Sequence, residues 1–407
     1  MPHPASLRSV PAVVATLALT GVAALTMSPA QAAPKPAAPT AQLNPSGNFL
    51  KLWTAEWMGK HDACTAATAT ALAQRVDYIA AMKGKFSATL LPGMRAANPD
   101  LRIGVYRNAT FGNAGMTEDL YAHDAGGNRI HAIKWPTTYL MQIDSPGWSS
   151  TLNASCADLV ARSGYDDCYL DVLGYGPLTS VYLNAKPVNK DGSLWTPNQW
   201  IAASSNLARN VKAATGEGVT GNGIGTGRRY WSTDMPSKPL IPATDQVAAE
   251  GFVRDAQSSV TAYRNEAEWK KDVDMLVDSE AAGKGMMTMT KLWITATPAQ
   301  VDAWHEYTLA TFLLGSGGKS KFFFLRSKAD TGWMDHPFDL INPGTPLGGY
   351  RPEGGVYKRD FTTSLVLVNP TKVTATVPLT RTYTTLTGAT VSGSVTLAPN
   401  TARILRF

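Results

Sequence analysis

The chain has 407 residues, a formal net charge of +6 and 44% hydrophobic residues, which suits one large domain and a smaller one. Its basic residues are scattered and form no stripe with interleaved aromatic residues, so we expect no nucleic-acid partner. Beyond the first 32 residues, no stretch of 18 consecutive apolar residues predicts a membrane span.

Residues 1–32 have the pattern of a secretory signal peptide. Arg8 precedes an apolar run from Val10 to Leu25, and Ala30-Gln31-Ala32 is the small-residue pattern that a signal peptidase accepts. The alternative is a membrane span, but the run is short and rich in small residues. We therefore predict cleavage near Ala32, a secreted protein that is not membrane-bound after cleavage, and a disordered Pro- and Ala-rich leader over residues 33–46.

From residue 47 to 327, strand-like apolar runs alternate with segments of helical period. Eight strands are predicted: Phe49–Trp57, Tyr78–Met82, Arg102–Arg107, Cys168–Val172, Val219–Ile224, Gln246–Phe252, Gly285–Trp293 and Lys321–Arg326. The predicted helices include Ser145–Ser163, Asn198–Thr215, Glu266–Ala282 and Pro298–Leu314. Near-continuous apolar strands that alternate with helices indicate a parallel sheet covered by helices. Eight of them predict an α/β fold, a closed (β/α)8 TIM barrel over residues 47–327.

One further apolar run, Tyr139–Asp144, makes the strand count ambiguous. We interpret it as an added element within a long connection, residues 108–145, which also contains a hairpin-like segment at 124–130. An open nucleotide-binding sheet is the alternative architecture, but no Gly-rich turn follows the first predicted strand.

After residue 328 the composition changes. Loop residues dominate to Glu353, and short Thr-rich runs of alternating polarity follow: Ser364–Val368, Val373–Pro378, Thr382–Leu386, Ser392–Leu397 and Arg403–Phe407. Asn369-Pro370 and Thr387-Gly388 mark the turns between them. We therefore predict a small antiparallel β domain, a β-sandwich over residues 328–407, that caps the barrel.

The sequence contains three cysteines, Cys64, Cys156 and Cys168. In an exported protein two of them can pair. We expect a Cys156–Cys168 disulfide, because a helix-to-strand return can bring these two together. The alternative, in which all three are buried as small apolar side chains, is equally compatible with the sequence. The spacing excludes a zinc site of the C-x-x-C kind.

In a barrel, functional side chains follow the carboxyl ends of the strands. Asp171 ends the fourth predicted strand and Glu250 lies near the end of the sixth, flanked by Ala249 and Gly251. Such a pair across the barrel mouth is what glycosidic cleavage needs, one carboxyl group protonated and the other ionised. The alternative for each acid is an ion-pair partner at the barrel rim.

Other polar and aromatic residues at predicted strand ends are candidates for binding a sugar. They are Trp53, Glu56, Trp57, Arg107, Asn108, Asn222, Lys291, Trp293 and Arg326. Aromatic faces stack on sugar rings and polar side chains bind hydroxyl groups, although any single Trp can instead serve core packing.

Several other chemistries lack their motifs. There is no H-E-x-x-H and no G-x-S-x-G, and the segment GSGGKS at 315–320 leads into a strand and opens no helix. GNGIGTG at 221–227 lacks the dinucleotide spacing and is interpreted as a loop at the barrel mouth. His61-Asp62 and His123-Asp124 are interpreted as polar loop residues. We therefore predict no metal and no cofactor.

Three segments carry a resemblance to a known family: CYLDV with Asp171, AAEGF with Glu250, and RDFTTSLVLVNPT at 359–371. The chain resembles the hypothetical glycosyl-hydrolase-like barrels of exported bacterial proteins, which are distantly similar to polygalactosaminidase and α-galactosidase-type barrels. The resemblance implies that Asp171 is the nucleophile, that Glu250 is the acid/base and that configuration is retained. Related barrels often carry Asn directly after the strand-four Asp, whereas this chain has Val172.

The predicted function is therefore an extracellular glycoside hydrolase that cleaves a polysaccharide or oligosaccharide with Asp171 and Glu250. Two alternatives remain at this point: a non-catalytic carbohydrate-binding barrel, and a metal-assisted hydrolase or deacetylase. We expect a monomer.

Overall fold

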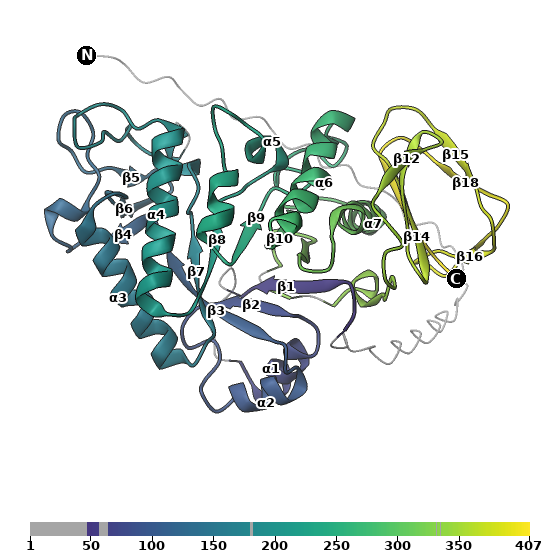
Figure 1. The fold of residues 1–407 in the computed structure, drawn as a ribbon, viewed down its shortest axis with the longest axis horizontal. Helices are drawn as coiled ribbons and strands as arrows, with labels where there is room; N and C mark the ends of the chain where they lie inside the picture. Colours follow the sequence, from purple (N-terminus) through teal and green to yellow (C-terminus); the bar gives the residue numbers. More distant parts are fainter. Residues whose placement is uncertain (1–46, 57–63, 180–181, 331, 334) are drawn as a thin grey trace, which may run out of the picture. The chain divides into compact units, whose positions relative to one another are not determined.

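The computed structural model describes residues 47–56, 64–179, 182–330, 332–333 and 335–407 (Figure 1). The predicted signal peptide and leader therefore lie outside the described residues, and both remain predictions. Within the described ranges, no helix has the length and apolar character that crossing a membrane requires.

Eight parallel strands close into a barrel, which confirms the predicted fold. Its order is β1 (Lys51–Ala55), β2 (Tyr78–Ala81), β3 (Arg102–Asn108), β7 (Asp167–Asp171), β8 (Gly218–Asn222), β9 (Gln246–Ala249), β10 (Gly285–Lys291) and β11 (Lys321–Leu325), which pairs back to β1. Each strand overlaps one of the eight predicted runs. Strand four of the barrel is β7 and strand six is β9, so Asp171 and the residue after β9, Glu250, occupy the positions predicted for them.

The two-residue period of β7 decides which of its side chains enter the barrel. Tyr169 belongs to the apolar cluster of the barrel lumen, together with Tyr78 and Trp53. Cys168 and Leu170 belong instead to the larger cluster between the strands and the helices. Because alternate residues share a face, Asp171 follows Tyr169 on the lumen side and lies at the carboxyl end of the strand, where a barrel opens to solvent.

The helices of the model are α1 (Ala66–Ala73), α2 (Leu91–Ala97), α3 (Pro146–Ser163), α4 (Pro197–Thr215), α5 (Gly227–Tyr230), α6 (Glu266–Ala281) and α7 (Pro298–Gly315). Short 3-10 helices are η1 (Glu118–Leu120), η2 (Gly176–Leu178), η3 (Lys238–Ala243) and η4 (Pro337–Leu340). Local chemistry sets the ends of the long helices. The Thr297 hydroxyl accepts the backbone N–H of Gln300 at the start of α7, and Gly164 takes a left-handed conformation (φ 69°) at the end of α3.

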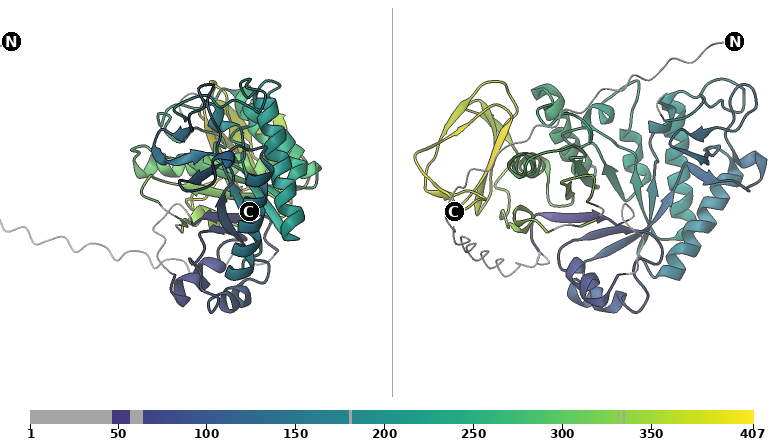
Figure 2. Two further views of the ribbon diagram at one scale, coloured as in Figure 1. Left: turned by 90° about the vertical axis from the view of Figure 1, so that its left-hand side faces the viewer. Right: turned by 180° about the vertical axis from the view of Figure 1, so that it is seen from behind.

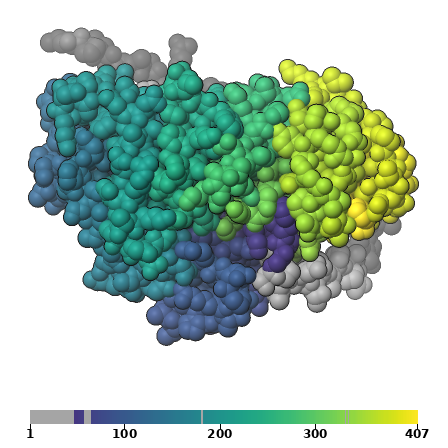
Figure 3. Space-filling model, viewed as in Figure 1, coloured from purple at the N-terminus to yellow at the C-terminus, as the bar shows by residue number. Residues whose placement is uncertain are grey.

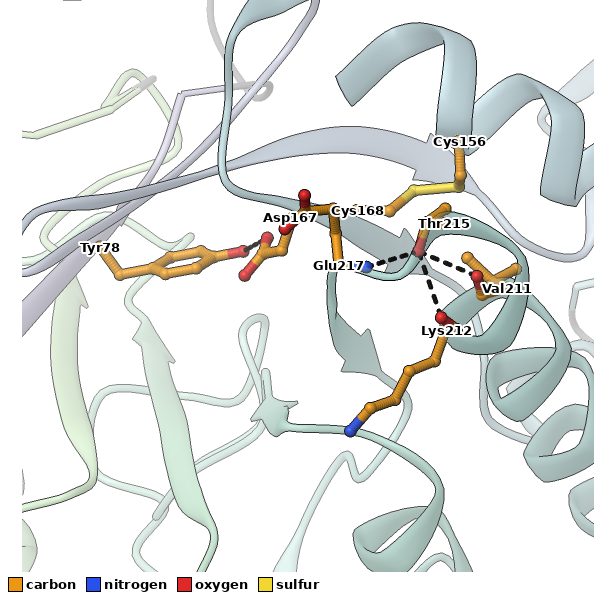
Figure 4. Close-up of a disulfide and its surroundings, with 8 residues drawn as sticks. All are labelled: Tyr78, Cys156, Asp167, Cys168, Val211, Lys212, Thr215 and Glu217. Carbon is orange, nitrogen blue, oxygen red and sulfur yellow. Dashed lines mark hydrogen bonds between the residues drawn. A yellow bond between two sulfur atoms is a disulfide. The ribbon is translucent and has the colours of Figure 1, made fainter. Parts of the chain in front are cut away.

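The predicted disulfide is present: Cys156 on α3 is bonded to Cys168 on β7 (Figure 4). Figure 4 shows Asp167 extending from β7 toward Tyr78, while the next residue, Cys168, extends toward α3. The bond therefore ties the strand that ends at Asp171 to the helix that covers it. Cys64 is a half-buried free thiol.

The long connection after β3 forms a three-stranded sheet outside the barrel, in the order β4 (Phe111–Asn113), β6 (Trp135–Leu140) and β5 (His131–Ala132). The added element predicted at 139–144 is thus confirmed as separate from the barrel, but its strand begins earlier, at Trp135, and ends at Leu140. The predicted hairpin-like segment closes with a backbone bridge between His123 and Arg129.

The carboxyl-terminal strands form two antiparallel sheets (Figure 2). One has the order β12 (Arg351–Glu353), β13 (Val356–Asp360), β14 (Ser364–Asn369), β19 (Thr401–Arg406), β16 (Tyr383–Thr384) and β17 (Thr390–Val391), and the other pairs β15 (Ala375–Pro378) with β18 (Ser394–Leu397). The prediction of loop structure up to Glu353 is wrong at its end, because Arg351–Glu353 pairs with β13.

Helix α7 is buried along most of its length, because the carboxyl-terminal strands cover the side that faces away from the barrel. It contacts β13, β14 and β19 as well as β11. Val366 and Ile404 accordingly share one apolar cluster with Leu309 and Phe312 of α7. The side chains of the barrel and of these strands adjoin on the face shown in Figure 3. The residues of α7 from Tyr307 to Gly315 are all buried, as expected for a helix segment enclosed in this way.

Candidate active site

A cavity of about 430 Å³ opens at the carboxyl ends of the barrel strands. Its walls carry the side chains of Tyr106, Trp135, Asp171, Val172, Pro177, Tyr182, Asn222, Arg229, Glu250, Lys291 and Trp293, together with four glycines. A Cβ atom on Gly174 would lie 2.3 Å from the carbonyl oxygen of Gly223, so the loops after β7 and β8 meet backbone to backbone.

Three donors hold the Asp171 carboxylate in place. The phenol of Tyr106 donates to Oδ2 at 2.6 Å, while the Val172 backbone N–H and the Asn222 amide donate to Oδ1 at 2.8 and 2.7 Å. Tyr106 lies at the end of β3, which pairs with β7, and Asn222 ends β8 on the other side. The two neighbouring strands of the barrel therefore fix the orientation of Asp171.

Asn222 also joins Asp171 to Glu250. Its amide nitrogen donates to Asp171 Oδ1 at 2.7 Å and to Glu250 Oε1 at 2.5 Å. These two oxygens are consequently no more than 5.2 Å apart, the sum of the two bonds. Since β8 lies between β7 and β9, the barrel closure itself brings the carboxyl groups together.

The other oxygen of Glu250 forms an ion pair with Lys291 at the end of β10. The Lys291 ammonium also lies 4.7 Å from the ring centre of Trp293. The Glu250 side chain keeps 28% of its surface exposed, whereas Lys291 keeps 9%. Glu250 is thus held between an amide and a cation and remains partly exposed to water.

The two acids have different proton affinities. Burial, and then the negative charge of Glu250, raises the pKa of Asp171 to about 6. Burial acts on Glu250 in the same direction, but Lys291 and Asn222 outweigh it and hold the pKa of Glu250 below its ordinary value of 4.5. Burial, followed by the charges of Asp171 and Glu250, raises the pKa of Tyr182 to about 12, which places its hydroxyl in the field of both acids. The cavity therefore contains an unequal, interacting pair of carboxyl groups.

Val172 adopts a left-handed backbone conformation, with φ at 58°. This region is unfavourable for a β-branched residue, and such outliers cluster at functional sites. The conformation turns the Val172 N–H onto Asp171, and the Val172 carbonyl accepts a hydrogen bond from Thr110 at 2.5 Å. The strained residue therefore contributes a donor to the carboxylate, whereas the Asn expected from the resemblance is absent.

The structure brings five of the predicted site residues to one cavity: Asp171, Glu250, Asn222, Lys291 and Trp293. Trp57 lies outside the described residues. Asn108 lies next to the site but caps its own turn, accepting hydrogen bonds from the backbones of Thr110 and Phe111.

Four predicted sugar-binding residues do not line this cavity, and the full burial of Trp53 contradicts the role predicted for it. Trp53 is 0% exposed in the barrel lumen, where its indole donates to the Thr288 carbonyl. Glu56 is buried between Lys85 and the backbone of Trp333. Arg107 lies on β3 beyond the cavity wall, because Tyr106 takes the inward position, and Arg326 lines a separate cavity beside Asp330. A position at a strand end does not fix whether a side chain points inward.

Four residues that the sequence did not single out line the cavity: Tyr106, Trp135, Tyr182 and Arg229. The position of Tyr106 could have been predicted from the sequence. It lies two residues before Asn108 at the end of the strand, and residues two apart share a face of a strand. Trp135, Tyr182 and Arg229 come from long connections, whose path across the barrel mouth no periodicity predicts.

No cluster of three or more His, Cys, Asp or Glu side chains suited to a metal ion exists in the described part of the chain. A larger cavity, of about 910 Å³, lies between α3 and α4 on the outside of the barrel. Asp144 is its one charged residue, so it lacks the paired acids of the barrel mouth. Of these two cavities, the one at the barrel mouth, with Asp171 and Glu250, is therefore the candidate active site.

The fold, with an acid-lined cavity at the carboxyl ends of the strands, is that of the TIM-barrel enzymes. The particular family follows from sequence: residues 95–364 match the model of hypothetical glycosyl hydrolase family 15, and the chain belongs to this family. The protein is thereby a member of the glycoside hydrolase class. A search of curated proteins finds no match.

Solved structures with a similar fold include an α-amylase from Malbranchea cinnamomea, at 12% identity over 88% of this chain and 96% of that one, with a TM-score of 0.50. The noncanonic maltogenic α-amylase AmyB from Thermotoga neapolitana has 10% identity over 88% and 98%, with the same TM-score. The glycoside hydrolase domain of PelA from Pseudomonas aeruginosa has 13% identity over 70% and 98%, with a TM-score of 0.44. The likeness to the two amylases is one of fold.

Proposed function

We propose that the protein is an extracellular glycoside hydrolase that cleaves a polysaccharide with Asp171 and Glu250 as its catalytic pair. The observation that carries the proposal is the Asn222 amide, which donates a hydrogen bond to each of the two carboxylates. The two accepting oxygens are therefore no more than 5.2 Å apart. Retaining glycosidases place their two carboxyl groups about 5–5.5 Å apart and inverting ones about 6.5–9.5 Å apart. The short separation therefore supports retention of configuration.

Asp171 is proposed as the nucleophile, because three donors from fixed elements orient its carboxylate. The pair carries one proton, and in the reacting form this proton lies on Glu250. The ionised Asp171 then attacks the anomeric carbon as Glu250 gives the proton to the glycosidic oxygen, which leaves as an alcohol. In the second step Glu250 takes a proton from water, the water oxygen attacks the same carbon, and the bond to Asp171 breaks. The 28% exposure of the Glu250 side chain gives water access for this step.

Aromatic side chains around the pair support a sugar substrate. Trp135 is 54% exposed, lies over Tyr182 at a ring separation of 6.4 Å and lines the cavity, as does Trp293. Aromatic faces of this kind suit the C–H faces of a sugar ring.

Export is part of the proposal. The amino-terminal pattern supports it, and so does the Cys156–Cys168 disulfide, since such bonds persist mainly in oxidising compartments. Fractionation of the cells that make the protein, followed by sequencing of its mature amino terminus, tests this directly. A mature chain beginning at Ala33 in the medium is expected, and an intact chain retained in the cytoplasm would contradict export.

The activity test compares the wild type with Asp171→Asn and Glu250→Gln on a panel of neutral, acidic and amino-sugar polysaccharides. Both variants should lose turnover while their circular dichroism stays unchanged. Asp158→Asn is the matched control, because Asp158 is an exposed carboxylate paired with Arg162 on α3. Binding of a polymer without turnover by the wild type would instead indicate a carbohydrate-binding barrel, and loss of turnover in a chelator would indicate metal-assisted hydrolysis.

The two roles are separable with a substrate whose leaving group needs no protonation, such as a nitrophenyl glycoside of the sugar released from the polymer. Glu250→Gln should retain formation of the glycosyl-enzyme from this substrate, and added azide should restore turnover. Asp171→Asn should be inactive on it. The reverse result would exchange the two roles.

A further inference from the structure

Four charged side chains line the catalytic cavity: Asp171, Arg229, Glu250 and Lys291. Not all of them form ion pairs with one another. Lys291 forms an ion pair with Glu250, and Asp171 is held by neutral donors. The remaining one, Arg229, has no ion pair with any carboxylate in the described part of the chain. The cavity therefore presents one uncompensated guanidinium to whatever enters it.

The local structure positions this guanidinium. Arg229 belongs to the short helix α5 between the β8 loop and η3, and its guanidinium carbon lies 5.2 Å from the ring centre of buried Tyr175. Its aliphatic part passes Gly225, which has φ at 74°, and a Cβ atom there would lie 3.2 Å from Arg229 Cδ. The cation–π contact thus holds the Arg229 side chain against the cavity wall, and the absence of a side chain at Gly225 leaves room for it there.

An arginine remains charged at every pH that a protein tolerates and binds carboxylate, sulfate and phosphate oxygens through two parallel hydrogen bonds. It repels a cationic sugar at the same place. In a partly enclosed cavity this preference is stronger than at an open surface, because fewer water molecules screen the charge.

We propose that the substrate is an acidic polysaccharide, and that an anionic substituent of one sugar, a carboxylate or a sulfate ester, binds to Arg229. This inference rests on the proposed glycosidase function and adds its substrate class. The anionic group lies on the α5 side of the cavity, away from Asp171 and Glu250, whose own charge would repel it. Polymers of amino sugars are disfavoured for the same reason.

The test uses matched polymers: a uronic-acid polymer and its carboxyl-reduced counterpart, and a sulfated polymer and its desulfated counterpart. The wild type should cleave at least one acidic polymer with a higher kcat/KM than its neutral counterpart. Arg229→Gln should lower kcat/KM on that polymer about 10- to 100-fold, as expected for a charged hydrogen-bonded pair, and by a much smaller factor on the neutral counterpart. Arg229→Lys should restore part of the loss.

Arg228 provides the control, since it carries the same charge on the same short helix but is exposed, lies 3.9 Å from Glu268 and does not line the cavity. Arg228→Gln should retain the wild-type preference. If Arg229→Gln lowered activity equally on acidic and neutral polymers, Arg229 would be a structural residue and the inference would be wrong.

A preference of the wild type for neutral or amino-sugar polymers would overturn the inference and leave the glycosidase function standing. If no polymer were cleaved, calorimetry would measure binding of the same matched polymers and would test the preference for an acidic polymer without turnover. Tighter binding of an acidic polymer that Arg229→Gln abolishes and Arg228→Gln retains would support the inference while the proposed hydrolysis fails. Equal binding of the matched polymers would reject both.

Discussion

The ammonium group of Lys291 contacts a carboxylate oxygen of Glu250, so that β10 supplies the counter-charge for the acid that follows β9. Both groups lie on the wall of the cavity, and Lys291 is nearly buried there. The Lys291 charge lowers the pKa of Glu250 while burial raises that of Asp171, so the two acids have different proton affinities.

The first prediction is an acidic pH optimum. The proposed reaction needs one proton shared by two carboxyl groups, one with a pKa of about 6 and one with a pKa below 4.5. For such a pair kcat/KM rises as the pH passes the lower pKa, is greatest between the two values and falls above the higher one, whichever group holds the proton. A profile of kcat/KM from pH 3 to 9 should therefore be bell-shaped with its maximum below pH 6. A maximum at pH 8 would contradict this.

The second prediction concerns Lys291→Met. Removing the ammonium leaves burial as the dominant effect on Glu250, so its pKa should rise and the acidic limb of the profile should move to higher pH. The pH range over which kcat/KM is high should become narrower. Lys284→Met is the control, because Lys284 lies outside this cavity, 3.9 Å from Asp245. An unchanged acidic limb in Lys291→Met would show that Lys291 does not set the proton affinity of Glu250.

The third prediction is that Asp167→Asn stabilises the protein at neutral pH. Asp167 is 1% exposed, bonded to the Tyr78 hydroxyl at 2.7 Å, and burial raises its pKa to about 6. A raised folded pKa means that its contribution to stability is full below the unfolded pKa of about 3.9 and is lost as pH rises through 6. Asparagine can keep the hydrogen bond without the buried charge, so the free energy of unfolding should rise by about 1–3 kcal/mol at pH 7.

Urea unfolding at pH 7 and pH 4 measures this effect. The gain should disappear at pH 4, where the wild-type side chain is largely protonated. A variant that is less stable than the wild type at pH 7 would show that the charge of Asp167 is needed, through Arg102 at 3.6 Å.

The fourth prediction concerns the Cys156–Cys168 disulfide, which closes a sequence separation of 12 residues. Loop-closure entropy for a ring of this size is about 3 kcal/mol. The double variant Cys156→Ser/Cys168→Ser, or the wild type in reductant, should lose roughly this much free energy of unfolding. Cys64→Ser should lose little, since Cys64 is half-buried and unpaired with another cysteine. Equal unfolding midpoints with and without reductant would contradict the prediction.

The fifth prediction is that Val172→Asn relieves backbone strain. Asparagine tolerates a φ of 58° far better than valine does, and the change should stabilise the fold by about 1 kcal/mol. Val172→Ala keeps the unfavourable conformation and should bring no such gain. Thermal unfolding of the three proteins measures the difference. A loss of stability in Val172→Asn would show that packing of the valine side chain outweighs the strain.

Much of the fold was predictable from sequence. Alternating apolar runs and helical segments predicted all eight barrel strands in order, and thus the positions of Asp171 and Glu250 two strands apart. The prediction of Trp53 as a sugar-binding residue was wrong because it relied on a residue type, whereas Trp53 lies on the inward face below the mouth and fills the lumen.

The sequence by itself determined the barrel, the carboxyl-terminal β strands and the strand ends that carry the two acids, because hydrophobic periodicity is a local property of the chain. Only the tertiary structure decided that Asn222 joins Asp171 to Glu250, that Lys291 neutralises one of them, and that Trp135, Tyr182 and Arg229 close the cavity. These contacts depend on strand register and on the paths of long connections across the barrel mouth. Such long-range relationships leave no periodic signal in the sequence, because they arise only when the barrel closes.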